Sequence, residues 1–228
     1  MQPMASLEVF AKYFALAFSA LLPVINPVGS SLVFLGMVGE ARDEVFRTLA
    51  KKIAISTALF LLTMDVAGAA VLKLFGISLP VVQFAGGLVL AAMGWGLLNE
   101  KDEPAKGEPS PLVADPSRLE QKVFYPFTFP LTAGPGVLVV TLTLSAHASK
   151  GTWLTVIFAH LGVLSGMLLM CVAVLVSYAY APKITEKIAP STAHGILRVI
   201  AFVLLCIGVQ IAWNGFYLLN GGRSLLPH

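Results

Sequence analysis

The sequence predicts an all-α polytopic membrane protein, in which six transmembrane helices form two inverted three-helix repeats with broken first helices. Three observations predict this class. Of the 228 residues, 57% are hydrophobic and 12% are charged, whereas a soluble domain carries roughly 25% charged residues. Long apolar segments alternate with loops that contain Lys and Arg. A short interruption containing proline and glycine occurs once in each half of the chain.

Six apolar segments reach the length of about 20 residues that a helix needs to cross a bilayer. We expect these spans at residues 9–38, 53–75, 79–98, 124–146, 153–180 and 196–219. The polar stretch between the third and fourth spans has the composition of a solvated linker. It divides one integral membrane domain into a first three-helix repeat at 1–98, a cytoplasmic linker at 99–122 and a second three-helix repeat at 123–228.

Loop charge predicts the orientation of the chain, because Lys and Arg collect in cytoplasmic loops. The loops after the first, third and fifth spans hold four, four and three Lys or Arg residues, with Arg198 at the last helix entry included. Only four others lie on the opposite side, namely Lys12, Lys73, Lys150 and Arg223. The bias predicts cytoplasmic odd-numbered loops and both termini outside the cytoplasm. Because each half crosses the membrane three times, an odd number, the two halves enter the membrane from opposite sides. Similar halves in opposite orientation form an inverted repeat.

The first interruption is the stretch 23–29, which reads Pro-Val-Ile-Asn-Pro-Val-Gly inside an apolar segment. Proline lacks the N–H group and clashes with the preceding turn, so an undistorted helix cannot continue through it. We interpret Asn26 as the N-cap of a new helix and Pro27 as its first residue.

The second interruption is the stretch 130–136, which reads Pro-Leu-Thr-Ala-Gly-Pro-Gly. Like the first, it begins with Pro, ends with Gly and contains an inner Pro. A broken helix that occurs once in each half of an apolar chain is typical of a transporter binding site.

Each helix start has unpaired N–H groups and about half a positive charge. Such donors are costly in lipid, so a break at membrane depth must line a cavity or be buried in protein. Two starts that face each other would bind a carboxylate or another small anion. The candidate substrate-binding residues are Asn26, Pro27, Gly29, Ser30, Thr132, Gly134, Pro135 and Gly136. The alternative is a pair of proline kinks that neighbouring helices satisfy.

Asp65 lies well inside the second predicted span, where a carboxylate is costly unless it is paired, protonated or hydrated. It could carry a proton or accept a substrate ammonium group; alternatively it lies near the outer headgroups or donates to backbone while protonated. His160 in the fifth span could relay protons. A lone histidine on an apolar helix is more often a buried hydrogen-bonding partner.

Other functional classes find little support in the sequence. The net charge is only +3, and no basic cluster alternates with stacking aromatic residues, which argues against nucleic-acid binding. Cys171 and Cys206 both lie in apolar runs and read as buried free thiols rather than a disulfide or metal site. The common catalytic and nucleotide-binding motifs are absent, so we expect no enzyme, no metal and no cofactor.

Several motifs resemble the MarC family of bacterial inner-membrane proteins. These motifs are Asn26-Pro27-Val28-Gly29, the stretch 72–78 followed by Phe84-Ala85-Gly86-Gly87, the stretch 130–136, and Gly208-Val209-Gln210. The resemblance covers nearly the whole chain. It implies six spanning helices and a place among amino-acid-exporter-like proteins, some of which are regarded as transporters of glycine and alanine.

The family pattern carries over residue by residue to Asn26, Pro27, Gly29, Gly134, Pro135 and Gly136. Gln83 departs from it, because a basic residue is expected before the Ala-Gly-Gly element. Asp65 is not part of the pattern that the resemblance supplies.

We therefore expect a secondary transporter of small neutral amino acids or similar small zwitterions in the bacterial inner membrane. Its expected partners are the lipid bilayer and the small-molecule substrate. Coupling to H⁺ or Na⁺ and homo-oligomer formation stay open. The main alternative is a non-transporting membrane scaffold or lipid-handling protein. A membrane enzyme would need a polar dyad within hydrogen-bonding reach, for example Asp65 and His160.

Overall fold

The computed structural model describes residues 2–39, 41–99, 116–187 and 190–221. Within these ranges every regular element is a helix, so the predicted all-α class is confirmed. The first half contains α1 (Gln2–Ile25), α2 (Pro27–Val38), α3 (Asp43–Leu74) and α4 (Leu79–Asn99). The second half contains α5 (Pro116–Gln121), the π-helix η1 (Val123–Thr132), α6 (Pro135–Ala148), α7 (Trp153–Ala179), α8 (Ala181–Lys187) and α9 (Pro190–Leu219).

The largest difference from the predicted spans is in α3, which begins at Asp43 rather than at residue 53. Asp43 and Glu44 occupy its first turn, where the helix dipole favours carboxylates. At 1.5 Å per residue its 32 residues extend roughly 48 Å, more than the ~30 Å hydrocarbon core of a bilayer. Of the predicted linker, residues 100–115 lie outside the described residues and the last part forms α5.

We predicted six membrane crossings, but fewer helices in the described part of the chain are long and apolar enough to cross a membrane. Among the described residues, four helical stretches are long and apolar enough to cross a membrane: Ser6–Val38, Leu79–Asn99, Trp153–Ala179 and Arg198–Leu219. The pair of η1 and α6, bent by 69°, would make a fifth. The predicted second span lies within α3, which is not among these stretches.

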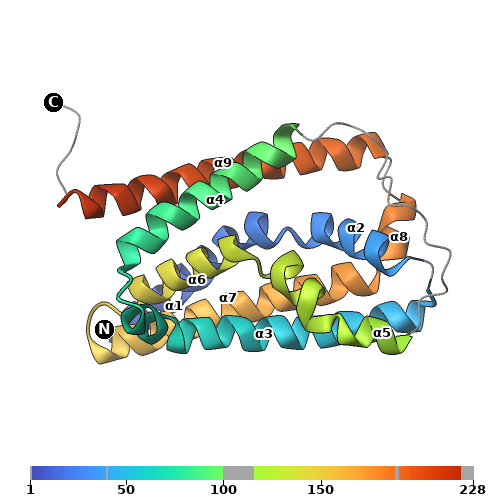
Figure 1. Ribbon diagram of the computed structural model, residues 1–228. Coiled ribbons are helices and arrows are strands. Elements are labelled where there is room, and N and C mark those ends of the chain that lie inside the picture. The colour runs from blue at the N-terminus through green and yellow to red at the C-terminus, as the bar shows by residue number, and fades with distance from the viewer. Residues whose placement is uncertain (1, 40, 100–115, 188–189, 222–228) are drawn as a thin grey trace.

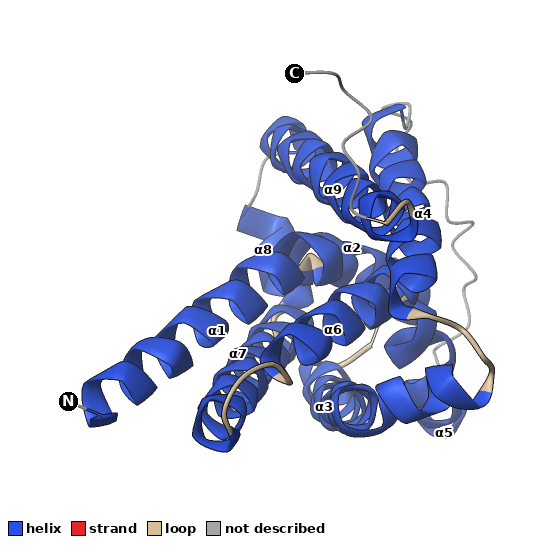
Figure 2. Cartoon of the chain, turned by 90° about the vertical axis from the view of Figure 1, so that its left-hand side faces the viewer, coloured by secondary structure: helices blue, strands red, loops and turns tan. Residues whose placement is uncertain are grey.

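The helices form layers in which the broken ones lie in the middle (Figures 1 and 2). Helices α4 and α9 lie side by side on one face, and α3 and α7 lie on the opposite face. Between them are α1, α2 and α6. The start of α1, the α3–α4 turn and the α6–α7 turn lie at the same end of the molecule (Figure 1).

Glycines bring α4 and α9 into backbone contact, because they let helix backbones approach closely. A Cβ atom added to Gly87 would lie 2.3 Å from the Ala212 nitrogen, and one added to Gly94 would lie 2.5 Å from the Leu205 nitrogen. Gly162 of α7 packs in the same way against α1, where an added Cβ would lie 2.5 Å from the Phe10 carbonyl oxygen. Any larger residue at these positions would push the helices apart.

An aromatic cluster joins α2, α3, η1 and α7 in the core. The Phe34 ring stacks on Tyr178 with 4.6 Å between ring centroids, and it meets Phe46 and Phe127 edge-on. All four side chains are buried. Aromatic pairs of this geometry contribute about 0.5–1.5 kcal/mol beyond the burial of their area.

The outer surface is apolar along much of its length. Val66 is 73% exposed, Leu59 60% and Trp95 62%, with many similar side chains on other helices. Exposed apolar surface of this extent is unusual for a soluble monomer and suits contact with lipid.

Candidate functional site

The first helix break lies at Asn26, as predicted. Asn26 adopts a left-handed conformation with φ of 45°, which Asn tolerates better than most residues. Its side-chain oxygen accepts a hydrogen bond from the Gly29 amide at 3.1 Å, so it caps α2. Pro27 is the first residue of α2. The Asn26 carbonyl oxygen accepts hydrogen bonds from both the Ser30 amide and the Ser30 hydroxyl, each at 2.8 Å.

The second break is more severe, because it joins two helices bent by 69°. Gly134 has extended backbone between η1 and α6, and a Cβ atom there would lie 2.9 Å from the Pro130 carbonyl oxygen. In η1 the hydroxyls of Thr128 and Thr132 donate to the carbonyl oxygens of Val123 and Phe127, at 2.8 and 2.7 Å. In both cases the acceptor lies five residues before the threonine.

The start of α6 has no side-chain cap, because its N-cap residue is Gly134. The first bond within this helix runs from the Leu138 amide to the Gly134 carbonyl oxygen at 3.2 Å. The amides of Gly136 and Val137 therefore precede the helical hydrogen bonds, and both residues are buried. These two N–H groups are the donors that an anion would use.

Tyr178 of α7 connects the two breaks, although it was not singled out in the sequence. Its hydroxyl oxygen lies 2.8 Å from the Thr132 hydroxyl, and it also interacts with the Ser30 side chain. The Thr132 hydroxyl donates its only hydrogen to the Phe127 carbonyl oxygen. The Tyr178 hydroxyl is therefore the donor in its contact with Thr132. Its position near the end of a span, where tyrosines are common for other reasons, hid it from sequence reasoning.

The two breaks lie together, and apolar side chains cover them. A Cβ atom added to Gly136 would lie 3.2 Å from Cγ1 of Val24, just before the first break. It would lie 2.2 Å from Cδ2 of Leu90, which is fully buried in α4. Among the described residues, Leu90 rather than open space therefore lies against the start of α6. Pro135 faces outward, in contrast to the buried Gly134 and Gly136.

The structure pairs Asp65 with His160, the two residues that the sequence analysis named as an example of a polar dyad. Oδ2 of Asp65 lies 3.1 Å from Nδ1 of His160. Asp65 is buried, and its Oδ1 has no hydrogen-bonding partner. Nε2 of His160 lies 3.1 Å from the Ser149 hydroxyl, which is exposed at the end of α6. The polar dyad that a membrane enzyme would need is thus present.

Asp65 lies away from the helix starts. The Ser145 hydroxyl donates to the Asp65 carbonyl oxygen at 2.8 Å. Ser145 is ten residues beyond Pro135, which is roughly 15 Å along α6 at 1.5 Å per residue. A glycine-sized substrate cannot place its carboxylate at Gly136 and its ammonium group at Asp65. The two groups of candidate residues therefore form two separate sites.

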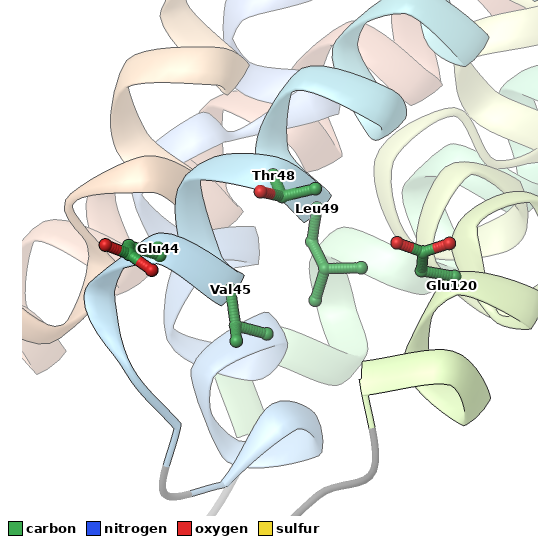
Figure 3. A pocket seen from close by; sticks show the side chains of 5 residues that line it. All are labelled: Glu44, Val45, Thr48, Leu49 and Glu120. Atoms are coloured by element: carbon green, nitrogen blue, oxygen red, sulfur yellow. The ribbon is translucent and has the colours of Figure 1, made fainter.

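A hollow of about 240 Å³ lies elsewhere, between the start of α3 and α5 (Figure 3). Its lining residues are Glu44, Val45, Thr48, Leu49 and Glu120. Glu120 also pairs with Lys52 at 2.8 Å. None of the predicted site residues lines this hollow.

Metal binding finds no support in the part of the chain that the structure describes, where no group of three His, Cys, Asp or Glu side chains could hold an ion. Both cysteines are free thiols. Cys171 is buried as predicted, but Cys206 is exposed on α9. The interpretation of Cys206 as a buried thiol was wrong, because apolar runs in a membrane protein also face lipid.

The all-helical fold, the apolar exterior and the helix breaks define an integral membrane protein. The chain belongs to the MarC family, since the model described as MarC family integral membrane protein matches residues 11–219. A UPF0056 membrane protein of Pyrococcus abyssi is 27% identical over 209 residues, which cover 92% of this chain and 96% of the relative. The UPF0056 inner membrane protein MarC of Escherichia coli is 28% identical over 220 residues, with the same coverage. No solved structure matches the chain.

Proposed function

We propose that the protein is a secondary transporter of small neutral amino acids or similar small zwitterions across the bacterial inner membrane. The observation that carries this proposal is the meeting of the two helix breaks, one from each half of the chain, around Tyr178. Relatives named inner membrane proteins are consistent with this location.

The substrate carboxylate would bind the start of α6. The buried amides of Gly136 and Val137 supply hydrogen-bond donors, and the positive end of the helix dipole favours an anion there. Hydroxyls of Ser30, Thr132 and Tyr178 lie between the breaks and could exchange their mutual contacts for contacts with the substrate.

The substrate ammonium group would bind carbonyl oxygens at the first break. Pro27 has no N–H group to offer the Pro23 carbonyl oxygen, four residues earlier, so the helical hydrogen bond at this position is missing. Unwound carbonyl groups next to helix starts bind cations in transporters with broken helices.

Six crossings in an inverted repeat, with both termini outside the cytoplasm, are part of the proposal. Its support is the pairing of elements across the halves. Helix α4 packs on α9 and α3 packs on α7, while α1 and α2 pack on α7 and, correspondingly, η1 and α6 pack on α3. If each helix is replaced by its counterpart in the other half, the same set of contacts results. The counterparts are α1 and α2 with η1 and α6, α3 with α7, and α4 with α9. Alternating access would then arise from rocking of one half against the other.

Leu90 and Tyr178 would have to move to admit a substrate, so the arrangement corresponds to a closed state of the transporter. Leu90 covers the amides of α6, and Tyr178 holds Thr132. Opening would separate α4 from α6 and uncover the polar groups of both breaks.

The test is uptake of radiolabelled glycine or alanine by proteoliposomes containing the purified protein. We expect at least a tenfold loss of uptake in Asn26→Ala and Gly134→Leu variants. Because Gly134→Leu will also clash with Pro130, Tyr178→Phe is the milder second variant, and Gln210→Ala on the exposed face of α9 is the control. Uptake at the parental rate by well-expressed Asn26 and Gly134 variants would contradict the proposal.

The second candidate is a non-transporting scaffold or lipid-handling protein, in which the breaks only bend helices. The close packing of Leu90 over Gly136 favours this candidate. It predicts that no small amino acid raises the melting temperature of the purified protein. A bound transport substrate would raise it, since binding to the folded form adds stability.

A further inference from the structure

A chain of polar contacts runs from the surface to a buried carboxylate at one end of the molecule. It consists of the exposed Ser149, His160 with 26% of its side chain exposed, and Asp65 with 2% exposed. Both distances in the chain are 3.1 Å. Asp65 belongs to α3 in the first half, whereas the other two residues belong to the second half.

The hydrogen atoms in this chain can be counted. The Ser149 hydroxyl has one hydrogen, and two acceptors lie within reach, the Ser145 carbonyl oxygen at 2.9 Å and Nε2 of His160 at 3.1 Å. When the hydroxyl donates to Ser145, Nε2 carries the hydrogen in its contact with Ser149, and the contact between Nδ1 and Asp65 needs another hydrogen. In that arrangement the His160–Asp65 pair holds one proton more than a neutral imidazole beside a carboxylate would hold.

Loss of that proton leaves a stable arrangement. Neutral His160 would keep its hydrogen on Nδ1 and donate to Asp65, and Ser149 would rotate its hydrogen from Ser145 to Nε2. Proton binding is therefore linked to a hydroxyl rotation at the surface. Ser149 provides the route by which a proton passes from solvent to His160, since it contacts both solvent and the imidazole.

We propose that Asp65 and His160 form the proton-binding site of this protein, loaded through Ser149 from the end of the molecule that carries the α6–α7 turn. The inference rests on the proposed transport function for its role, which is to couple a proton gradient to substrate movement. Because Asp65 and His160 belong to opposite halves, a rocking motion would separate them and break the contact through which they share a proton.

The surroundings of the pair favour a proton over a sodium ion. Hard cations prefer several oxygen ligands, whereas Asp65 faces an imidazole nitrogen and its carbonyl oxygen already accepts a bond from Ser145. Other titratable groups lie further off: His147 on α6 is exposed and contacts the Thr143 carbonyl oxygen, and Lys73 lies two turns along α3. Gln83 on α4 contacts Thr143 and is uncharged.

The same three residue types in this order also occur in serine hydrolases. Its position disfavours a nucleophilic Ser149. It lies at the C-terminal end of α6, where exposed carbonyl groups and the negative dipole end oppose an oxyanion.

The experiment compares two assays in proteoliposomes with alanine as the probe. The first is exchange of alanine at equal pH on both sides, and the second is accumulation driven by a pH gradient. For Asp65→Asn and His160→Gln we expect exchange within threefold of the parent and at least a tenfold loss of accumulation. His147→Gln is the matched control, because it removes an exposed histidine at the same end, and it should retain both activities.

Accumulation by Asp65→Asn at the parental level would overturn the proton site while leaving transport intact. Absence of both activities in the parent would overturn the transport function instead. The site then has an independent readout in ¹⁵N-histidine NMR of the purified protein. We expect the His160 signal to change in Asp65→Asn but not in His147→Gln; an unchanged signal would overturn the proposal. Labelling of Ser149 by a fluorophosphonate probe would overturn it in favour of an esterase-like site.

Discussion

The hydroxyl oxygen of Tyr178 lies 2.8 Å from the hydroxyl oxygen of Thr132, although 46 residues separate them in the chain. This contact joins α7 to the last residue before the second helix break. Through Ser30 the same tyrosine also reaches the first break. A single buried side chain therefore lies beside both of the features that the sequence placed in different halves.

Tyr178→Phe should lower the free energy of unfolding by about 1–3 kcal/mol, because the Thr132 oxygen loses its donor in a buried site. The ring would still stack on Phe34. Adding Thr132→Val should cost less than the sum of the two single changes, since both polar partners are then gone. Denaturant unfolding in detergent measures the coupling, and strictly additive changes would contradict the proposed hydrogen bond.

Asn26→Ala should destabilise the protein more than Asn26→Gly. Both changes remove the side-chain cap on the Gly29 amide, which is worth about 0.5–2 kcal/mol. Alanine in the left-handed backbone conformation also lowers the stability by roughly 1–2 kcal/mol, whereas glycine adopts this conformation freely. Melting temperatures of the two variants check this order. Equal values would indicate that the backbone changes conformation when Asn26 is replaced.

Gly94→Ala should destabilise the α4–α9 pair, whereas Gly96→Ala on the same helix should not. A Cβ at Gly94 would lie 2.5 Å from the Leu205 nitrogen, and a Cβ at Gly96 would meet nothing within 4 Å. We expect a loss of about 1–3 kcal/mol for the first, as in overpacked cores, and a change of at most about 1 kcal/mol for the second. Thermal unfolding of both variants in the same detergent provides the comparison.

Leu90→Ala should uncover the start of α6. A buried leucine replaced by alanine costs about 2–5 kcal/mol, and the Gly136 backbone would lose its nearest cover. Leu88→Ala is the control, because Leu88 lies on the same helix and is 51% exposed. In a background without native cysteines, Val137→Cys should react faster with a small thiol reagent when Leu90 is alanine. No change in rate would show that other atoms shield this position.

Cysteine labelling in intact cells should reveal the predicted orientation. With Cys171 and Cys206 replaced, Lys150→Cys in the α6–α7 turn should react with a membrane-impermeant maleimide. Glu44→Cys at the start of α3 should react only after the cells are opened, because the basic loops are predicted to be cytoplasmic. The reverse pattern would invert the topology.

Much of this protein could be read from the sequence, because the relevant signals are local. Asn26 and Pro27 form a cap within four residues, and Gly134 before Pro135 marks a helix start within two. The excess of apolar residues determined that the solvent is a bilayer, since helices without a polar face cannot be covered by water.

Only the tertiary structure decided which residues meet. Asp65 and His160 are 95 residues apart, and nothing in their local patterns marks them as a pair. The sequence analysis did not single out Ser149, Tyr178 or Leu90. A serine at a helix end, a tyrosine near the end of a span and a leucine in an apolar helix are all common. Their roles depend on how three helix layers cross, and that crossing is set by close packing between distant segments.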